Sequence, residues 1–392
     1  VQILSGNNDY TGDTTITTGT VKLTGNLDSA TDLIIASGTT LDLQAALTVA
    51  TLDLDGTISN TAGTSSLVIS GASDLNGNVT TTGTQTYTGA VTLSAATVTL
   101  TTTNSQITFS STVNSEASEA NALNISVGSS EVEFDGVIGG GTNGSLGAIT
   151  ITGALDLDAA LTSATSLSVS TTSNLGASVT TSGTQTYSGA VTLSAATVTL
   201  TTTNNNVTFS STVDSDAIGS KRNLTLTLGS GSATFSNVVG GTSLATITLN
   251  SSATFNAAVT ADNLTIAASK TATVKAAVTV ASNITLSGSS TLAVLNASAM
   301  TIAGTLVDSG TGNTITVNDS DASSAPSEVT FSGTVAADTL TIGSATTAGK
   351  AKFTGSGGAT ITNITVPGGN HADEDSTATF NYALTATAVT LD

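Results

Sequence analysis

The chain has 392 residues, and its 7 basic and 27 acidic residues give a formal net charge of −20 at pH 7. So few cations argue against nucleic acid and against an anionic membrane surface as partners, and the absence of cysteine excludes a disulfide framework. No apolar run approaches the roughly 18 residues of a membrane helix, so we expect no membrane insertion. The chain opens directly at VQILSG, without the basic-then-apolar pattern of a signal peptide, so we expect that a secreted protein would be seen here in mature or trimmed form.

Short runs in which Val, Ile or Leu alternates with Thr, Ser, Asp or Asn follow one another along the chain. In chain order they include residues 41–49, 91–101, 123–127, 149–157, 224–228, 264–268, 315–318 and 340–343. A period of two predicts β-strands with an apolar inner face and a polar outer face. The Gly, Asn and Ser residues between the runs are typical of turns. We expect an all-β protein without amphipathic helices.

Residues 79–113 and 179–213 are nearly the same sequence, with 30 of 35 positions identical. The wider segments 79–140 and 179–241 form an internal duplication. Such a copy indicates a repeat array, in which stacked units share one continuous core. We therefore expect residues 1–392 to form one continuous β-solenoid.

A shorter element, Thr or Glu, then Phe or Tyr, then three residues and Val, recurs within this array. It occurs at 86–91, 108–113, 133–138, 186–191, 208–213, 234–239, 254–259 and 330–335, with the variant TFNYAL at 379–384. Successive aromatics from Tyr87 through Phe109 to Phe134, and from Tyr187 through Phe209 and Phe235 to Phe255, are 20–26 positions apart, which suits one coil of a parallel β-helix. An antiparallel sandwich is the main alternative, but it would want hairpin turns every 8–12 residues. Parallel βαβ units would need helices that the sequence does not offer.

Four segments fit no strand and are expected to be loops that project from the solenoid. They are residues 114–122, 214–223, 318–328 and 367–376. The first two occupy equivalent places in the duplication but differ in sequence, a variation that surface loops tolerate.

The opening segment 5–25 contains an Asn-x-Tyr-Thr-Gly core, then Thr-Thr-Ile, then Gly-Thr-hydrophobic-x-Leu. It resembles the autotransporter-associated β-strand repeat, and the matching residues are Asn8, Tyr10, Thr11, Gly12, Thr14, Thr15, Ile16, Gly19, Thr20, Val21 and Leu23. The TFSSTV and ALNISV segments resemble filamentous-haemagglutinin-like bacterial surface proteins. These resemblances imply a right-handed β-helix, an extracellular or cell-surface location and an adhesive or structural role.

The residues offer little support for catalysis. The single histidine, His371, lies in a Gly- and Asp-rich loop without a nucleophile motif. The pairs Asp53/Asp55 and Asp156/Asp158 place carboxylates on one outer face of a strand, about 7 Å apart. Aromatic platforms and basic groups of a sugar-cleaving groove are not concentrated near them. We predict no enzymatic activity and no required cofactor.

Calcium is the one metal that the sequence suggests, because acidic loops with Asn and backbone carbonyls suit a hard cation. The candidate ligands are Asn318, Asp319, Asp321, Asp373, Glu374 and Asp375. Neither loop matches an EF-hand. The alternative is charged loop tips that prevent edge-to-edge aggregation.

The two ends of the array are expected to lack caps. The chain opens with the apolar strand VQIL and closes with LTATAVTLD, and no edge Lys or Pro protects either one. We predict a structural protein that builds a bacterial fibre, sheath or surface layer. It would contact copies of itself, or other segments of a longer surface protein, end to end or by strand addition.

Three alternatives remain open. An adhesin would bind glycans or a host surface through loops 114–122 and 214–223. A polysaccharide-active enzyme rests on fold analogy alone. Ice binding rests on the Thr-x-Thr rows, such as Thr97–Thr99–Thr101.

Overall fold

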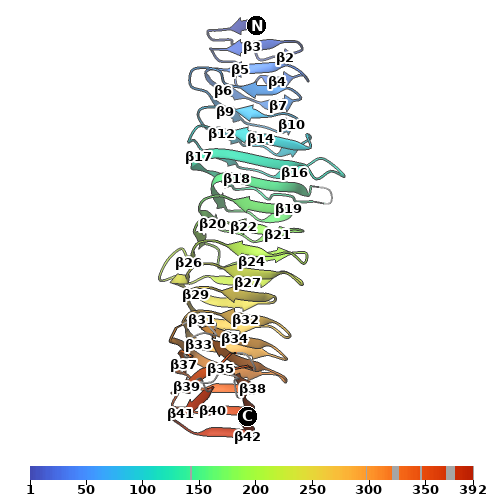
Figure 1. The fold of residues 1–392 in the computed structure, drawn as a ribbon. Coiled ribbons are helices and arrows are strands. Elements are labelled where there is room, and N and C mark those ends of the chain that lie inside the picture. Colours follow the sequence, from blue (N-terminus) through green and yellow to red (C-terminus); the bar gives the residue numbers. More distant parts are fainter. Residues whose placement is uncertain (142–143, 297, 320–325, 345–346, 368–375, 392) are drawn as a thin grey trace. The chain divides into compact units, whose positions relative to one another are not determined.

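The computed structural model describes residues 1–141, 144–296, 298–319, 326–344, 347–367 and 376–391. These residues form β-strands and no helix, and the strand pairs with a described register run parallel. The chain divides into two compact units, Val1–Gly189 and Ala190–Asp392. Both units are built of stacked β-solenoid coils, about 17 turns of about 22 residues in all (Figure 1). The predicted parallel solenoid with 20–26 residues per coil is confirmed.

The first unit consists of short strands joined by tight corners, with three longer strands in its second half. The strands are β1 (Gln2–Leu4), β2 (Thr14–Ile16), β3 (Thr20–Leu23), β4 (Asp32–Ile35), β5 (Thr40–Leu43), β6 (Ala46–Val49), β7 (Thr51–Leu54), β8 (Thr57–Ser59), β9 (Ser66–Ile69), β10 (Ser73–Leu75), β11 (Val79–Thr80), β12 (Gln85–Tyr87), β13 (Val91–Leu93), β14 (Thr97–Thr101), β15 (Ile107–Phe109), β16 (Val113–Ser115), β17 (Ala122–Phe134), β18 (Leu146–Leu157), β19 (Leu161–Val169), β20 (Ser173–Leu175), β21 (Val179–Thr181) and β22 (Gln185–Tyr187).

The second unit continues the same pattern with generally longer strands. They are β23 (Val191–Leu193), β24 (Thr197–Thr202), β25 (Val207–Phe209), β26 (Val213–Ser215), β27 (Asn223–Thr227), β28 (Ser232–Phe235), β29 (Val239–Leu249), β30 (Ser252–Phe255), β31 (Val259–Ile266), β32 (Thr271–Val274), β33 (Val278–Ser287), β34 (Thr291–Asn296), β35 (Met300–Ser309), β36 (Thr314–Asp319), β37 (Glu328–Phe331), β38 (Val335–Ile342), β39 (Lys350–Phe353), β40 (Ala359–Val366), β41 (Thr377–Phe380) and β42 (Leu384–Leu391).

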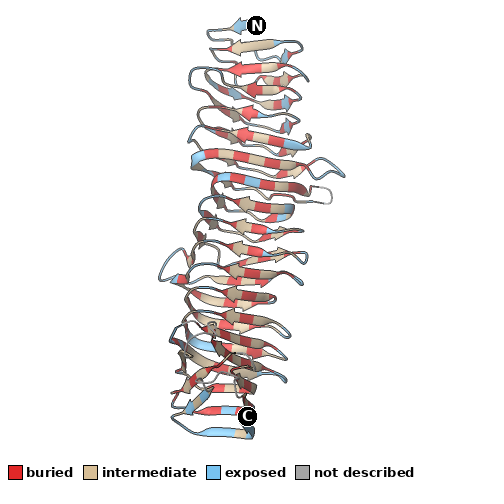
Figure 2. Cartoon of the chain, viewed as in Figure 1, coloured by how far each residue is buried: buried red, intermediate tan, exposed pale blue. Residues whose placement is uncertain are grey.

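The alternating sequence produces an alternating burial pattern along the strands. In β14, for example, Val98 and Leu100 are fully buried while the threonines between them lie toward solvent. Figure 2 shows this alternation as buried and less buried bands that recur from coil to coil. Each buried aliphatic side chain contributes about 1.5–3 kcal/mol, so the aliphatic column holds the coils together without disulfides.

The recurring aromatic element turns out to mark a corner of the coil. Tyr87 is the last residue of β12 and Val91 the first of β13, and the same relation joins Phe109 of β15 to Val113 of β16. Because the coils are in register, Phe109 stacks on Tyr87 at 5.1 Å and on Phe134 at 4.9 Å between ring centroids. The second unit contains equivalent stacks, with centroid distances of 4.6–4.9 Å.

A buried polar network interrupts the apolar column at Gln85, and the duplicated copy repeats it at Gln185. Gln85 is fully buried, and its Nε2 donates to the carbonyl oxygen of Thr101 at 2.9 Å. The Tyr87 hydroxyl donates to Gln85 Oε1 at 3.0 Å. Burial raises the pKa of Tyr87 above its ordinary value, so this hydroxyl stays protonated and can donate. Such a network favours one register of the coils, because a shifted register would leave buried polar groups unpaired.

Within the described part of the chain, no helix has the length and apolar character needed to cross a membrane.

Candidate functional site

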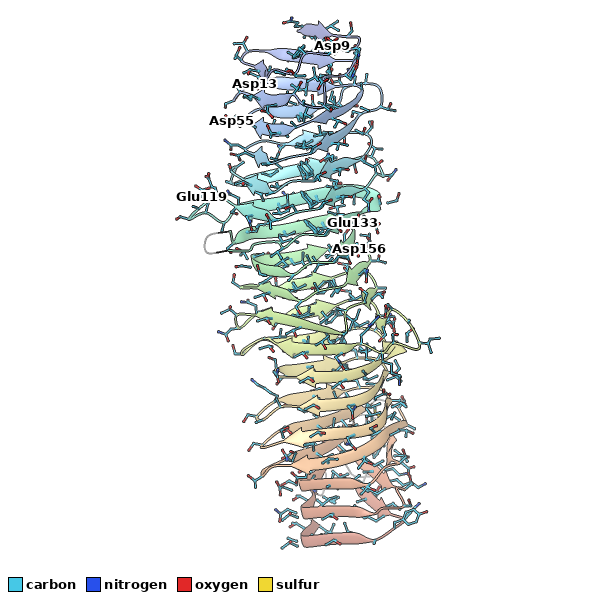
Figure 3. The ribbon with its side chains drawn as sticks, turned by 180° about the vertical axis from the view of Figure 1, so that it is seen from behind. Asp9, Asp13, Asp55, Glu119, Glu133 and Asp156 are labelled. Carbon is cyan, nitrogen blue, oxygen red and sulfur yellow. The ribbon has the colours of Figure 1, made fainter. Side chains whose placement is uncertain are left out.

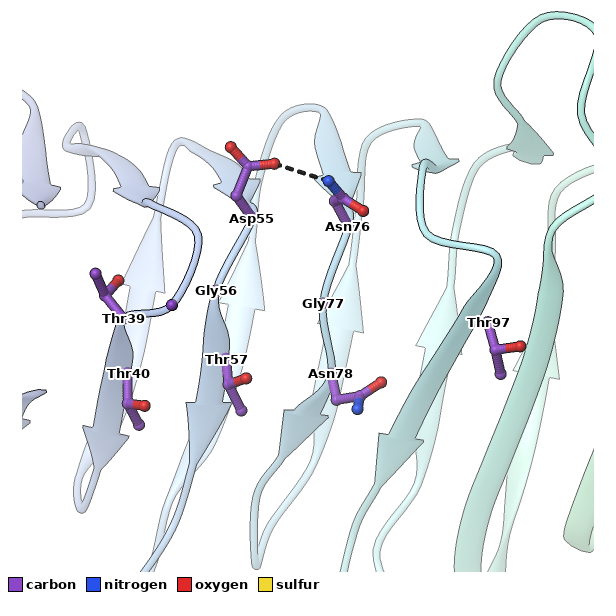
Figure 4. A pocket seen from close by; sticks show the side chains of 10 residues that line it. Thr39, Thr40, Asp55, Gly56, Thr57, Asn76, Gly77, Asn78 and Thr97 are labelled. Atoms are coloured by element: carbon purple, nitrogen blue, oxygen red, sulfur yellow. Dashed lines mark hydrogen bonds between the residues drawn. The ribbon is translucent and has the colours of Figure 1, made fainter. Parts of the chain in front are cut away.

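A polar groove on the first unit is the candidate binding site. It has a volume of about 410 Å³ and runs across successive coils. Figure 4 shows its lining residues, which are Gly38, Thr39, Thr40, Asp55, Gly56, Thr57, Asn76, Gly77, Asn78 and Thr97. All of them are polar or glycine, so the groove offers hydrogen bonds rather than an apolar wall.

Two glycines form the floor of this groove because neighbouring coils approach closely there. A Cβ atom on Gly56 would lie 2.5 Å from the carbonyl oxygen of Thr39, and one on Gly77 would lie 1.8 Å from that of Gly56. Any side chain at either position would push the coils apart. The polar side chains on both sides of the floor therefore stand above a shallow channel.

The sequence reasoning identified Asp55 but missed the groove around it. The expected pairing of Asp55 with Asp53 on one strand is wrong, because β7 ends at Leu54 and Asp55 lies in the turn that follows. The hydrogen-bond partner of Asp55 is Asn76, one coil away. The similar tripeptides Asp-Gly-Thr (55–57) and Asn-Gly-Asn (76–78), one coil apart, are the signal that could have revealed it.

Asp53 itself faces a like charge in the next coil. It is the register partner of Asp74, and burial together with the negative charges of Asp55 and Asp74 raises its pKa. Asp53 and Asp74 therefore form an acidic row on the outer sheet face. The described residues place no basic side chain within ion-pair distance of this row.

The second predicted pair belongs to a larger acidic cluster. Asp156 is the register partner of Glu133, and both lie on the outer face of the first unit (Figure 3). Carboxylate oxygens of Glu133, Asp135 and Asp158 lie within 4.8 Å of one another. Burial, followed by the charge of a neighbouring aspartate, raises the pKa of Glu133 and of Asp158.

Three convergent carboxylates can share one hard cation such as Ca²⁺. Glu133 and Asp135 were not predicted, since they come from the coil before Asp158. The signal that could have found them is the spacing between EFD (133–135) and LDLD (155–158), which equals one coil.

The calcium ligands predicted from the sequence fall mostly outside the described residues. Asp321, Asp373, Glu374 and Asp375 lie there, and so does His371. Asn318 and Asp319 are consecutive residues of β36, so their side chains point to opposite faces of the strand. The buried Asp319 carboxylate accepts a hydrogen bond from the amide of Ser327 at 3.0 Å. A calcium site at these loops stays a prediction.

The predicted loop 214–223 is shorter in the structure, where residues 216–222 connect β26 to β27 and are held by ion pairs. The Arg222 guanidinium donates through Nε to Asp216 Oδ1 at 2.7 Å and through Nη2 to Asp216 Oδ2 at 2.8 Å, and Lys221 pairs with Asp262. Ile218 between them is 87% exposed. Two-point attachment fixes the base of the loop while its apolar tip faces solvent.

No protein-family model, curated protein or solved structure matches the chain.

Proposed function

We propose that this protein is a structural β-solenoid of the bacterial exterior that builds a fibre, sheath or surface layer by adding coils at an open edge. The main support is that the described coils add to one another in parallel register, so the edge of a coil accepts a further strand from whichever segment lies next to it. Strand β42 pairs with β40 along one edge only. Its residues contain no Lys, no Pro and no charged group that would block a further strand.

The apolar side chains of β42 are far more exposed than their register partners in β40, the strand of the preceding coil. Val389 is 54% exposed, whereas its partner Ile364 in β40 is 2% exposed. Leu391 is 73% exposed, whereas its partner Val366 is 7% exposed. Another coil on this edge would bury both side chains, at about 1.5–3 kcal/mol each, and would satisfy the open backbone groups.

The same edge accepts a coil from a second copy or from another segment of a longer surface protein. A second copy would make a head-to-tail contact, which repeats into an open filament. The resemblance of residues 5–25 to autotransporter repeats supports the extracellular location. The charge of −20 opposes contact between copies, so we expect assembly to increase with ionic strength.

The test is sedimentation velocity of the 392-residue chain over a range of concentrations and salt. We expect wild type to form species larger than one chain, and Val389→Lys to remain a single chain because a charge would be buried at the contact. Thr385→Lys is the matched control, since its partner Thr360 points outward and is exposed in the preceding coil. A wild-type chain that stays single throughout, or a Val389→Lys variant that assembles like wild type, would contradict the proposal.

The exposed Ile218 favours adhesion through loop 214–223 as a second candidate function. An exposed apolar side chain on a loop that ion pairs hold in place is suited to insertion into a pocket of a partner. Replacing 216–221 with a Gly/Ser linker should abolish binding to bacterial or host cells if this loop is the adhesive element. Unchanged cell binding would refute that assignment.

A further inference from the structure

We propose that the groove floored by Gly56 and Gly77, called here the glycine groove, binds a neutral saccharide chain that lies across the coils. This proposal does not depend on the proposed self-assembly through β42, because the residues that line the groove lie between Gly38 and Thr97 and none belongs to β42. It also differs from the adhesive loops expected from the sequence.

The first argument is the arrangement of polar groups in two rows. One row contains Thr40, Thr57 and Asn78, which stand at the beginnings of β5, β8 and β11. The other contains Asp55 and Asn76, on the opposite side of the glycine floor (Figure 4). Within each row, groups repeat at the coil spacing of about 4.8 Å.

The second argument is the hydrogen-bonding capacity that these side chains retain. Asp55 Oδ1 accepts from Asn76 Nδ2 at 3.0 Å, which leaves Asp55 Oδ2 and Asn76 Oδ1 as acceptors. Asn78 Oδ1 accepts from the amide of Thr99 at 2.8 Å, which leaves its Nδ2 as a donor. Within the described part of the chain, the Thr40 and Thr57 hydroxyls have no hydrogen-bond partner. The groove thus presents donors and acceptors side by side.

The chemistry of the lining selects among ligand classes. A nucleic acid needs cations, and the lining has none. An added peptide strand needs an open sheet edge, but β8 is paired on both sides, with β5 and β11. A single carboxylate is a poor match for a bound divalent cation. A sugar hydroxyl both donates and accepts, which fits the mixture of threonine, carboxamide and carboxylate.

The geometry also indicates how such a chain would lie. The rows run from coil to coil, and three residues in one row span about 10 Å. An extended β-linked polysaccharide advances by about half of that distance per sugar, close to the coil spacing of about 4.8 Å, so consecutive sugars would meet consecutive coils. The negative charge of Asp55 and of the whole chain favours an uncharged saccharide over an acidic one.

A second copy of the tetrapeptide that contains Asp55 provides control residues outside the groove. The sequence Leu-Asp-Leu-Asp occurs at 52–55 and again at 155–158, but Ala159 and Ala160 follow the second copy in place of Gly56 and Thr57. Asp156 in the second copy is a matched aspartate outside the groove lining, since it accepts from Asn174 Nδ2 at 2.8 Å as Asp55 accepts from Asn76. Thr150, on the outer face of β18, is a matched threonine.

The experiment is saturation-transfer NMR on the full chain with cellohexaose, chitohexaose and a galacturonate hexamer, each at about 10 mM to detect a Kd near 1 mM. We expect a signal from at least one of the two neutral hexamers and none from the acidic one. The double variant Asp55→Ala/Thr57→Val should weaken that binding by at least about tenfold, because it removes two hydrogen-bonding groups. Asp156→Ala/Thr150→Val should bind like wild type.

Far-UV circular dichroism and melting establish that both variants remain folded. Should the groove variant unfold, Thr40→Val, which keeps the β-branched shape, replaces it. Three results would overturn the proposal. They are no signal from either neutral hexamer, preferential binding of the galacturonate, or equal binding by the groove and control variants.

Discussion

The stack formed by Tyr87, Phe109 and Phe134 allows a quantitative test of the solenoid core. Phe109 is fully buried and has a stacked ring on each side. Phe109→Ala should cost about 3–5 kcal/mol for the cavity and about 0.5–1.5 kcal/mol for each lost stacking partner. We expect a total of about 4–6 kcal/mol, because partial collapse of the neighbouring coils recovers some of it.

Phe380→Ala is the matched comparison. Among the residues that the structure describes, Phe380 stacks on Phe353 alone, at 4.6 Å, and it is only partly buried. Its replacement should therefore cost about 2 kcal/mol or less, since less area and one stacking partner are lost.

Native-state hydrogen exchange is the suitable assay, because solenoid stability is a sum of local coil terms. Phe109→Ala should accelerate amide exchange most strongly in β12, β15 and β17 and much less in distant coils. Urea unfolding gives the accompanying loss of stability. Equal costs for the two variants, or faster exchange spread evenly over the chain, would refute the stacked-coil reasoning.

Three further predictions concern single positions. Gly77→Ala should destabilise the first unit by about 3 kcal/mol or more in urea unfolding, because its Cβ would overlap the Gly56 carbonyl. Gly12→Ala is the control, since there is open space around Gly12, and it should change the free energy of unfolding by less than about 0.5 kcal/mol. Gln85→Leu should cost about 1–3 kcal/mol, because it leaves the buried Tyr87 hydroxyl without its acceptor, while the Thr101 carbonyl keeps the amide of Thr81 as a donor; adding Tyr87→Phe should recover part of that loss. Asp158→Asn should raise the melting temperature at pH 7 and lose this advantage as the pH falls through the raised carboxyl pKa values toward about 4.

The sign of the last prediction follows from the raised pKa values of Glu133 and Asp158. The folded state then binds more protons than the unfolded chain between the ordinary and the raised carboxyl pKa, so stability falls as pH rises through that window. Asp158→Asn removes one of the repelling charges. An unchanged melting temperature at pH 7, or an advantage that persists at low pH, would contradict this assignment of the repulsion.

Much of the fold could be predicted from the sequence because its signals are local and repeated. The alternation in 123–127 predicts the buried and outer faces of a strand correctly, and the recurrence of Tyr87, Phe109 and Phe134 predicts the length of one coil. The run 91–101 was expected as one strand, but a corner at 94–96 divides it into β13 and β14, because the alternation continues through the corner.

The candidate groove depends on neighbours across coils, which a linear sequence reveals less directly. Asp55 meets Asn76, and Glu133 meets Asp158, only once the coil register is known. The similar tripeptides 55–57 and 76–78 become informative when the coil length is known, because only then do their glycines superimpose.

The most direct test of coil addition is electron microscopy and fibre diffraction of the concentrated wild-type chain at high salt. We predict unbranched filaments with a repeat of about 4.8 Å along the filament axis, the spacing of successive coils. Dispersed particles of one chain each at every concentration, or filaments without that axial repeat, would contradict the proposal that β42 continues the solenoid into a neighbouring coil.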